Sequence, residues 1–358
     1  MPINLMSEYS TRLDERFKQK SLTEAHCGHD YSWDGVNSIV VFTIDNMAVQ
    51  DYNINAAGNR FTGGNAPTNI GDEKNTYTLQ RKRSFSGIIE GTTSMDQKNI
   101  KKANALLKQT WDEVMVPEID KYRLKTWADG AGLTVLNTTA LTNKTIIRAL
   151  LESQSKLNNR FIPRDGRVCF ITETMAVETK LAEELGYNDA FTSKALVNGQ
   201  CARLGGLPIV SVPDEWMPAG VEFMIKYKRA TADPTKLKML RALNQVQGIY
   251  GTVLEGLTRY DSFVLANKAN GILVYGKDAA AMVDVGTISV ANAKLTLTGA
   301  TAGATFKYTT DGSNPKTSET ADTLTSGTTN APASGTKIKV YGSKTGLLNS
   351  GIVEYTVA

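Results

Sequence analysis

The feature that most constrains this chain is a long helical pattern between residues 94 and 130. Ser94 precedes Gln97 by three residues, which is the spacing of a capping box, and Gly130 supplies a stop signal. Such a helix of about 35 residues would be ~50 Å long, far beyond the usual three turns or so. The pattern predicts a structural spine more than the scaffold of an active site. Its apolar residues recur at helical spacing: Ile100, Ala103, Leu107, Trp111, Val114, Met115, Ile119 and Tyr122.

Pro117 lies inside this helical pattern. Proline has no backbone N–H and its ring crowds the preceding turn, so we expect a bend or a local break there. A tolerated kink without a role is the alternative.

An extended segment from Thr76 to Ile89 precedes the helix and carries the basic trio Arg81, Lys82 and Arg83. Alternation along a strand places Arg81 and Arg83 on one face and Lys82 on the other, which dilutes a common phosphate-binding surface. We therefore expect acidic residues of a neighbouring subunit to pair with the trio. A patch that binds phosphate is the alternative.

Residues 1–36 read as an extended arm with one amphipathic helix, Met6 to Lys20. The apolar residues of that helix, Leu13 and Phe17 among them, need a surface, and we expect it on an adjacent subunit. Ser38 to Ile44 is apolar enough to predict a buried strand. Residues 51–76 are rich in Asn and Gly with few core formers, which predicts a projecting two-stranded hairpin; a surface insertion without a role is the alternative.

Strand and helix patterns alternate in the middle of the chain and predict a mixed α+β unit. Residues 257–275 read as a terminal hairpin that turns at Lys268–Gly271. The remaining expected elements are helices at 142–158 and 173–185 and strands at 167–171, 206–212 and 221–227.

The composition changes near Ala279, and residues 280–358 are dominated by Thr, Ser, Gly and Ala without helical periodicity. Short alternating segments such as KLTLTG and KIKVYGS are separated by turn residues, notably Asp311 to Pro315. This pattern predicts a small all-β sandwich.

The composition excludes several classes of protein. The net charge of +4 over 358 residues is too mild for a dedicated nucleic-acid binder. No apolar run approaches the ~20 residues of a membrane-spanning helix, and the N-terminus lacks the apolar core of a secretory signal. Cys27, Cys169 and Cys201 are too few and too scattered for a disulfide framework, so we expect a reducing cytoplasm and a buried free thiol at Cys169.

The sequence predicts no catalytic, cofactor-binding or metal site. His26-Cys27-Gly28-His29 is the one local cluster that resembles a metal motif, but the chain has only two histidines and the other cysteines lie far away. A mobile arm is also a poor place for a catalytic base. The glycines at 58–64 and 205–206 lack the context of a phosphate loop, and Glu183 and Glu184 read as the solvated face of a helix.

Three segments resemble the major capsid proteins of tailed bacteriophages with the Hong Kong 97 fold, of the type found in phages of Gram-positive hosts. They are DERFKQKSLTEA at 14–25, YTLQRKRSFSGII at 77–89 and MVPEIDKYRL at 115–124, and the resemblance covers roughly residues 7–275. It implies an N-terminal arm at 1–36 and the first P-domain strand with the extended loop at 37–93. The spine helix, the A-domain and the rest of the P-domain follow at 94–279. In that family the extended loop lies across the neighbouring subunit.

The C-terminal region carries a second resemblance. YTTDGSNP at 308–315 and the segment 336–357 are similar to the immunoglobulin-like module of chitobiase-type glycosidases. The resemblance implies a surface appendage at 280–358 that folds independently, so that a chain ending near Lys277 would still assemble. Weak glycan binding through Tyr308, Tyr341 and Tyr355 is the accompanying hypothesis.

Together the resemblances imply a structural protein of the virion and not an enzyme. Pentamers and hexamers, assembled in the host cytoplasm, would form an icosahedral shell around the DNA genome, with non-specific contact to that DNA and no membrane contact. Scaffold, portal and decoration proteins are the further partners implied. Covalent cross-linking is not implied, because Lys74 is the only loop lysine near the required place. The alternatives are an encapsulin-type nanocompartment shell and a secreted carbohydrate-binding or adhesive protein.

Overall fold

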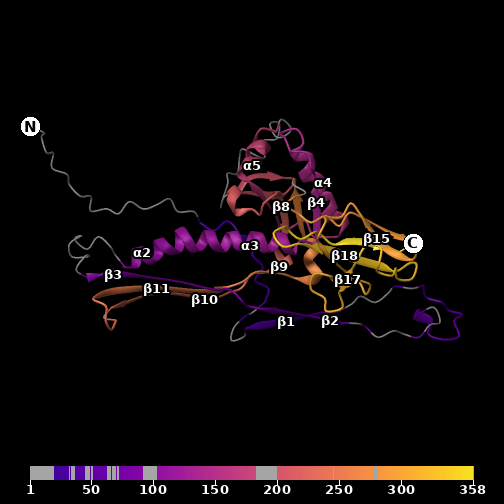
Figure 1. The fold of residues 1–358 in the computed structure, drawn as a ribbon, viewed down its shortest axis with the longest axis horizontal. Helices are drawn as coiled ribbons and strands as arrows, with labels where there is room; N and C mark the ends of the chain where they lie inside the picture. Colours follow the sequence, from indigo (N-terminus) through magenta and orange to yellow (C-terminus); the bar gives the residue numbers. More distant parts are fainter. Residues whose placement is uncertain are drawn as a thin grey trace, which may run out of the picture.

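The computed structural model combines a long helix, a distal sheet, a larger central sheet, a projecting hairpin and a C-terminal all-β unit (Figure 1). No described helix is both long and apolar enough to cross a membrane. The structure describes residues 20–31, 33, 37–44, 49, 51–62, 66, 70, 72–91, 103–182, 200–244, 246–277 and 280–357.

The predicted long helix is present from residue 103 to residue 130 and is called the spine helix below. It consists of α2 (Ala103–Thr110), a π-helical turn (Trp111–Met115) and α3 (Val116–Gly130). The N–H of Val116 donates to the carbonyl of Trp111, five residues back, directly before Pro117. The interruption expected at Pro117 is thus a widened turn within a continuous helix. The predicted start at Ser94 lies outside the described residues.

A three-stranded antiparallel sheet lies against the spine helix (Figure 1). Its order is β10 (Thr235–Asn244), β11 (Gly251–Tyr260) and β3 (Lys82–Glu90). Trp111, Met115 and Ile119 of the helix pack in one cluster with Tyr260, and Phe85 joins this cluster at its edge. Gly256 makes room for Phe85, because a Cβ atom at Gly256 would lie 2.3 Å from the Phe85 ring.

The prediction of a terminal hairpin at 257–275 is wrong. β11 pairs with β10 and β3, whereas β13 (Ile272–Gly276) belongs to the central sheet. Asp261 ends β11, since its carboxylate accepts hydrogen bonds from the N–H groups of Gln80 and Ser262 and from the Tyr122 hydroxyl. The chain then crosses between the sheets through β12 (Phe263–Val264), which pairs with β9 (Thr231–Ala232), and a 3-10 helix (Ala266–Gly271).

The central sheet has six strands in the order β4-β13-β8-β5-β7-β6. Alternate residues of β5 point to opposite faces: Val168 and Phe170 pack toward α3, and Cys169 and Ile171 pack toward the two helices on the other side. Cys169 is buried, as expected. The other members are β4 (Leu133–Leu136), β5 (Arg167–Thr172), β6 (Gln200–Leu204), β7 (Leu207–Val212) and β8 (Val221–Tyr227), and the helices are α4 (Ile146–Asn159) and α5 (Glu173–Lys180).

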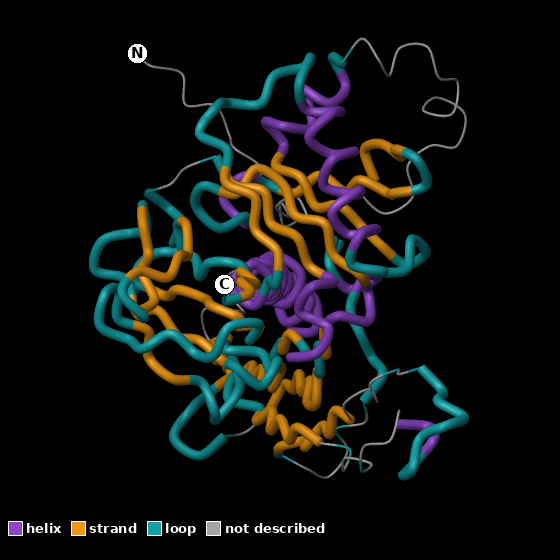
Figure 2. Tube along the Cα trace, turned by 90° about the vertical axis from the view of Figure 1, so that its right-hand side faces the viewer, coloured by secondary structure: helices purple, strands orange, loops and turns teal. Residues whose placement is uncertain are grey.

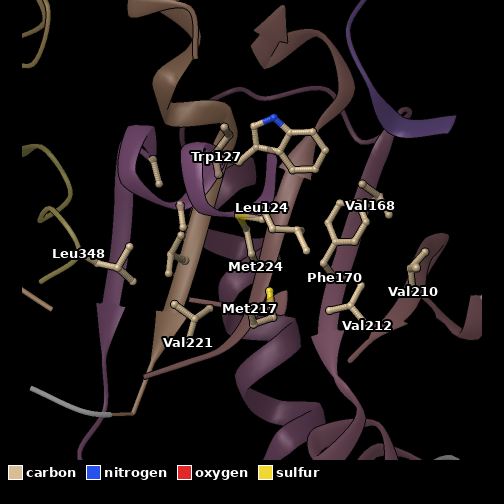
Figure 3. Packing of buried hydrophobic residues seen from close by; sticks show 14 of the residues in the cluster. Leu124, Trp127, Val168, Phe170, Val210, Val212, Met217, Val221, Met224 and Leu348 are labelled. Carbon is tan, nitrogen blue, oxygen red and sulfur yellow. The ribbon is translucent and has the colours of Figure 1, made fainter. Parts of the chain in front are cut away.

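Figure 3 shows one face of this core, where Leu124 and Trp127 of the spine helix lie against Phe170 and Met224 of the sheet. The Trp127 and Phe170 rings are 5.6 Å apart. The central sheet therefore shares its core with the C-terminal half of the spine helix. The helix predicted at 173–185 ends earlier, at Lys180 with Leu181 as its C-cap, and Glu183 and Glu184 lie outside the described residues.

The projecting hairpin consists of β1 (Ser38–Ile44) and β2 (Asp72–Thr78), paired antiparallel along their whole length. The extended segment predicted at 76–89 is divided, because β2 ends before Leu79 and β3 begins at Lys82 in a different sheet. A 3-10 turn (Arg60–Thr62) lies in the described part of the loop between β1 and β2.

The C-terminal unit (residues 280–358) has two sheets around its own core, which is centred on Leu295, Ile338 and Val340. This confirms the all-β prediction. The unit is not separate from the rest, however: it lies beside the end of the spine helix (Figures 1 and 2). Met282 and Leu348 belong to the core cluster that contains Leu124 and Trp127 of that helix. Its strands are β14 (Thr287–Ala291) with β15 (Lys294–Thr298), and β17 (Asp322–Leu324), β16 (Thr305–Thr309), β18 (Lys337–Ser343) and β19 (Val353–Thr356) in that spatial order.

Candidate assembly surfaces

The hairpin presents an apolar stripe on one face of β1. Val40, Phe42 and Ile44 are 40%, 61% and 71% exposed, whereas Ile39 and Val41 of the same strand pack against the subunit's own core. The expectation of a buried strand is therefore wrong, because one face of β1 is exposed and the other is only half-buried. A two-stranded sheet has two faces, and only one of them meets the rest of the subunit.

The described part of the hairpin loop adds further exposed apolar side chains. Tyr52 and Phe61 contact each other edge to face, with ring centroids 5.1 Å apart, and Ile54 is 67% exposed. The N–H of Asn53 donates to the carbonyl of Arg60. The loop thus contributes apolar surface without contributing to a core cluster of its own subunit.

The outer face of the three-stranded sheet is a second, partly apolar surface. The pairing register places Ile88, Leu243 and Leu257 opposite to the face that packs on the spine helix. Ile88 is 58% exposed, and an ion pair between Arg241 and Glu255, at 2.6 Å, crosses the same face. The register also places Lys82, Arg259 and Glu90 on this face, so the surface mixes apolar and charged side chains of both signs, as protein contacts do.

The basic trio has an intramolecular partner, which corrects the expectation of a neighbouring subunit. Arg81 and Arg83 both pair with Glu118 of the spine helix, at 2.9 and 2.6 Å. The Arg81 guanidinium also lies 4.2 Å from the centroid of the Tyr122 ring. Lys82 is exposed and points to the other face, as alternation predicted. The two arginines therefore fasten β3 to the spine helix.

The described end of the arm is anchored on its own spine helix. Asp120 accepts hydrogen bonds from the Ser21 hydroxyl at 2.8 Å, the Leu22 N–H at 2.8 Å and the Thr23 hydroxyl at 2.6 Å. Arg123 pairs with Glu24 at 2.5 Å. Three donors on one buried carboxylate fix the point from which the arm leaves the subunit.

The amphipathic helix expected at 6–20 includes Leu13 and Phe17. Of its residues, all but the last lie outside the described part of the chain. Docking of that segment on an adjacent subunit stays a prediction.

The His26–His29 cluster belongs to this anchor. The Cys27 thiol is buried, and the His26 ring packs edge-on against Phe170 at 5.7 Å. Burial, together with Lys226, lowers the pKa of His26 to about 4. Within the described ranges, no group of three His, Cys, Asp or Glu side chains is placed to hold a metal ion. The cluster serves packing in this structure.

A substitution at Gly28 can test how closely the arm packs against the rest of the subunit. A Cβ atom at this position would lie 1.8 Å from the carbonyl oxygen of Thr231, which is backbone and cannot move cheaply. Gly28→Ala is expected to lower the free energy of unfolding by about 1–3 kcal/mol, the usual range for overpacking. Gly87→Ala is the matched control, since a Cβ there meets nothing within 4 Å. Urea denaturation of both variants measures the difference, and equal stabilities would contradict tight seating of the arm.

A buried charge network joins the arm to the centre of the subunit. Lys226 donates to the His26 carbonyl at 2.7 Å, lies 3.6 Å from the Asp233 carboxylate and 3.6 Å from the Trp127 ring centroid. Asp233 also accepts hydrogen bonds from the Trp127 indole at 2.9 Å and the Ser262 hydroxyl at 2.5 Å. Burial alone would raise the pKa of Asp233, but Lys226 and these donors lower it overall.

The network shows no feature of a reacting site. Each described group in it is satisfied by packing or by hydrogen bonds that hold two segments together, so its role is to fix the arm, α3 and β8 in one arrangement.

The glycan hypothesis finds no structural support, and the turn at Gly205 differs from a phosphate loop. Tyr341 is buried, and Tyr308 and Tyr355 are half-buried against the C-terminal unit's core, so they form no exposed stacking platform. Gly205 and Gly206, with φ of 55° and 88°, form the tight turn between β6 and β7 and do not open a helix.

Polar grooves run between the hairpin and the C-terminal unit. One of them has a volume of about 520 Å³ and is lined by Asp72, Glu73 and Lys74 on one side and Asp311 and Glu319 on the other. Lys74 thus lies at a groove of its own subunit, with no geometry that indicates cross-linking.

Comparisons with known proteins identify the fold. No family model matches the chain, and neither does any curated protein. Solved structures do match: a structure of Mycobacterium phage Che8 has a TM-score of 0.60 at 15% identity, over 76% of this chain and 97% of that one. The capsid structure of cyanophage P-SCSP1u gives 0.61 at 11% identity, over 76% and 92%. This chain shares its fold with solved bacteriophage capsid structures.

A third match extends the same result. The mature capsid of bacteriophage PhiM1 gives a TM-score of 0.57 at 11% identity, over 76% of this chain and 92% of that one. Identities this low establish the fold alone. Each of these matches covers 76% of this chain, so about a quarter of the chain is unmatched, a share close to that of the C-terminal unit.

Proposed function

We propose that this chain is the major capsid protein of a tailed bacteriophage with the Hong Kong 97 fold. The likeness to solved phage capsids supports the shell-forming role. The arm, the projecting hairpin, the spine helix with its distal sheet and the six-stranded sheet correspond to the N-arm, extended loop, P-domain and A-domain. Copies would associate as pentamers and hexamers around packaged DNA in the virion after assembly in the host cytoplasm.

The observation that carries this proposal is the apolar stripe of Val40, Phe42 and Ile44. A projecting hairpin with a water-exposed apolar face is costly for a solitary monomer, because each such side chain gains roughly 1.5–3 kcal/mol when it is buried. In this proposal the partly apolar outer face of the three-stranded sheet of another copy covers the stripe. A contact between two different surfaces of one chain is heterologous, and it closes into rings when the rotation permits.

In this proposal the C-terminal unit is an immunoglobulin-like domain on the outer surface of the shell. Its Thr- and Ser-rich strands offer little to bind phosphate, and a sandwich on the inside would occupy volume needed by the genome. Scaffold, portal and decoration proteins are the partners this role requires, and contact with DNA would be non-specific, in keeping with a net charge of +4.

Electron microscopy of the purified chain tests the proposal. Closed shells of uniform size, alone or with a co-expressed scaffold, are the expected result. Monomers or small oligomers under all such conditions would contradict it. Shells that enclose a protein cargo in uninfected cells would favour the nanocompartment alternative, and a monomer that binds glycans would favour the adhesive one.

A further inference from the structure

One lysine of the C-terminal unit forms hydrogen bonds with the end of the spine helix. Lys316 lies in the turn region between β16 and β17, and its Nζ donates to the carbonyls of Asp129 at 3.0 Å and Ala131 at 2.7 Å. Asp129 lies in the last turn of α3, where backbone carbonyls lack partners within the helix, and Ala131 is the C-cap residue that follows it. A lysine that donates to such carbonyls acts as a C-terminal cap supplied from a distant part of the chain.

Further contacts attach the same unit to the start of the central sheet. The N–H of Ile352 donates to the Gly132 carbonyl at 2.7 Å, and the N–H of Gly351 donates to the Thr134 hydroxyl at 2.9 Å. The fit is close, because a Cβ atom at Gly351 would lie 2.6 Å from that hydroxyl oxygen. The unit therefore contacts both sides of the point where the spine helix ends and β4 begins.

Two more contacts widen this attachment. The Asn314 side-chain amide donates to the carbonyl of Ala266 at 2.9 Å, in the 3-10 helix that crosses between the sheets. Glu354 pairs with Arg160 at the end of α4, at 2.8 Å. The unit thus touches the spine helix, β4, the crossing segment and α4 at once.

We propose that the C-terminal unit is a brace that fixes the spine helix relative to the six-stranded sheet, and that Lys316 is its latch. This role concerns the subunit itself and goes beyond formation of a shell. Assembly of a chain that ends near Lys277 stays a prediction, but such a chain would lack this brace.

The hydrogen-bond donors and the pKa of the Lys316 amine predict that the latched state becomes more stable as the pH rises. A neutral amine has two N–H donors, and two carbonyls receive them. Burial lowers the pKa of Lys316 to about 7, while Asp129 counteracts this shift. The other charged groups that face this site are Lys125 of the spine helix, Glu319 of the unit and Lys74 of β2.

Proton linkage determines whether a rise in pH strengthens or weakens the latched state. A detached, solvated lysine keeps its proton up to a pKa near 10.5, whereas the latched amine loses it near 7. The detached state therefore binds more protons between these values, and the latched state gains stability as the pH rises through that window. The expected gain is about tenfold in the latching equilibrium between pH 6 and pH 8.

Amide hydrogen exchange of the full chain tests the brace. Lys316→Met removes the donors and keeps a side chain of similar length, so exchange at Gly351 and Ile352 should accelerate about tenfold or more. Protection inside the unit, for example in β16 and β18, should not change, which distinguishes detachment from unfolding. Lys339→Met is the matched control, since Lys339 donates to the Gly312 carbonyl within the unit itself.

The pH dependence supplies the second readout. After correction for intrinsic exchange rates, protection at Gly351 and Ile352 should rise about tenfold from pH 6 to pH 8 in the wild type and stay flat in Lys316→Met. Unchanged exchange in Lys316→Met, or an equal rise in both proteins, would overturn the proposal. Neither result bears on whether the chain forms shells.

Discussion

Replacing Phe42 by Asp is expected to abolish shell formation while leaving the subunit folded. Phe42 is 61% exposed in the subunit and belongs to no core cluster of the described chain, so its own fold loses little. In the proposed contact a carboxylate at this place would have to leave water without a partner, which costs several kcal/mol. The penalty recurs in every copy, and a lattice built from one repeated contact amplifies it.

Phe42→Leu is the matched control, since it keeps an apolar side chain of similar size at the same place on the stripe. Light scattering and electron microscopy measure assembly, and thermal unfolding by circular dichroism measures the subunit. The leucine variant should assemble and the aspartate variant should not, with similar melting temperatures. Normal shells from Phe42→Asp would show that the stripe is not an assembly surface.

The second large effect is expected from Asp233→Asn, which removes the negative charge beside Lys226. Both side chains are fully buried, and a buried ammonium without its carboxylate costs about 3–5 kcal/mol. The asparagine amide also brings two donors to a site where Trp127, Ser262 and Thr231 already donate. A loss of this size approaches the whole stability of many proteins.

Urea denaturation measures this loss, and Asp30→Asn is its control. Asp30 pairs with Arg229 at 3.8 Å on the surface, where an ion pair contributes at most about 1 kcal/mol. Equal effects of the two substitutions would refute the role assigned to the buried network. Because the pKa of Asp233 is lowered in the folded state, its contribution is present above the ordinary value of 3.8 and is lost as the pH falls below it.

Much of the fold could be predicted from periodicity. The spine helix, the helix at 146–159 and the strands at 167–172, 207–212 and 221–227 follow patterns that local physics imposes. Pairing partners were harder to predict. The alternating pattern of residues 257–260 is compatible with a hairpin to residues 272–275 or with a hairpin to β10. In the structure these residues pair with β10, whose long alternating run was not identified from the sequence.

The candidate assembly surfaces, too, could be predicted only in part. Exposure of Phe42 and Ile44 depends on which face of β1 meets the core, and a uniformly apolar strand does not encode that choice. The partners of Arg81 and Asp120 lie about 40 and 100 residues away, so the ion pair and the arm anchor could not be read from spacing. Charged residues inside an apolar strand, as at Glu222 and Lys226, are signals that could have indicated buried charge.

The most direct test of the capsid proposal is a cryo-electron microscopy map of particles assembled from this chain. The map should show a closed shell in which the apolar stripe of each copy is covered by a neighbouring copy, with the C-terminal unit on the outer surface against the end of its own spine helix. A closed shell in which Phe42 remains exposed to solvent, or the absence of any shell, would contradict the account.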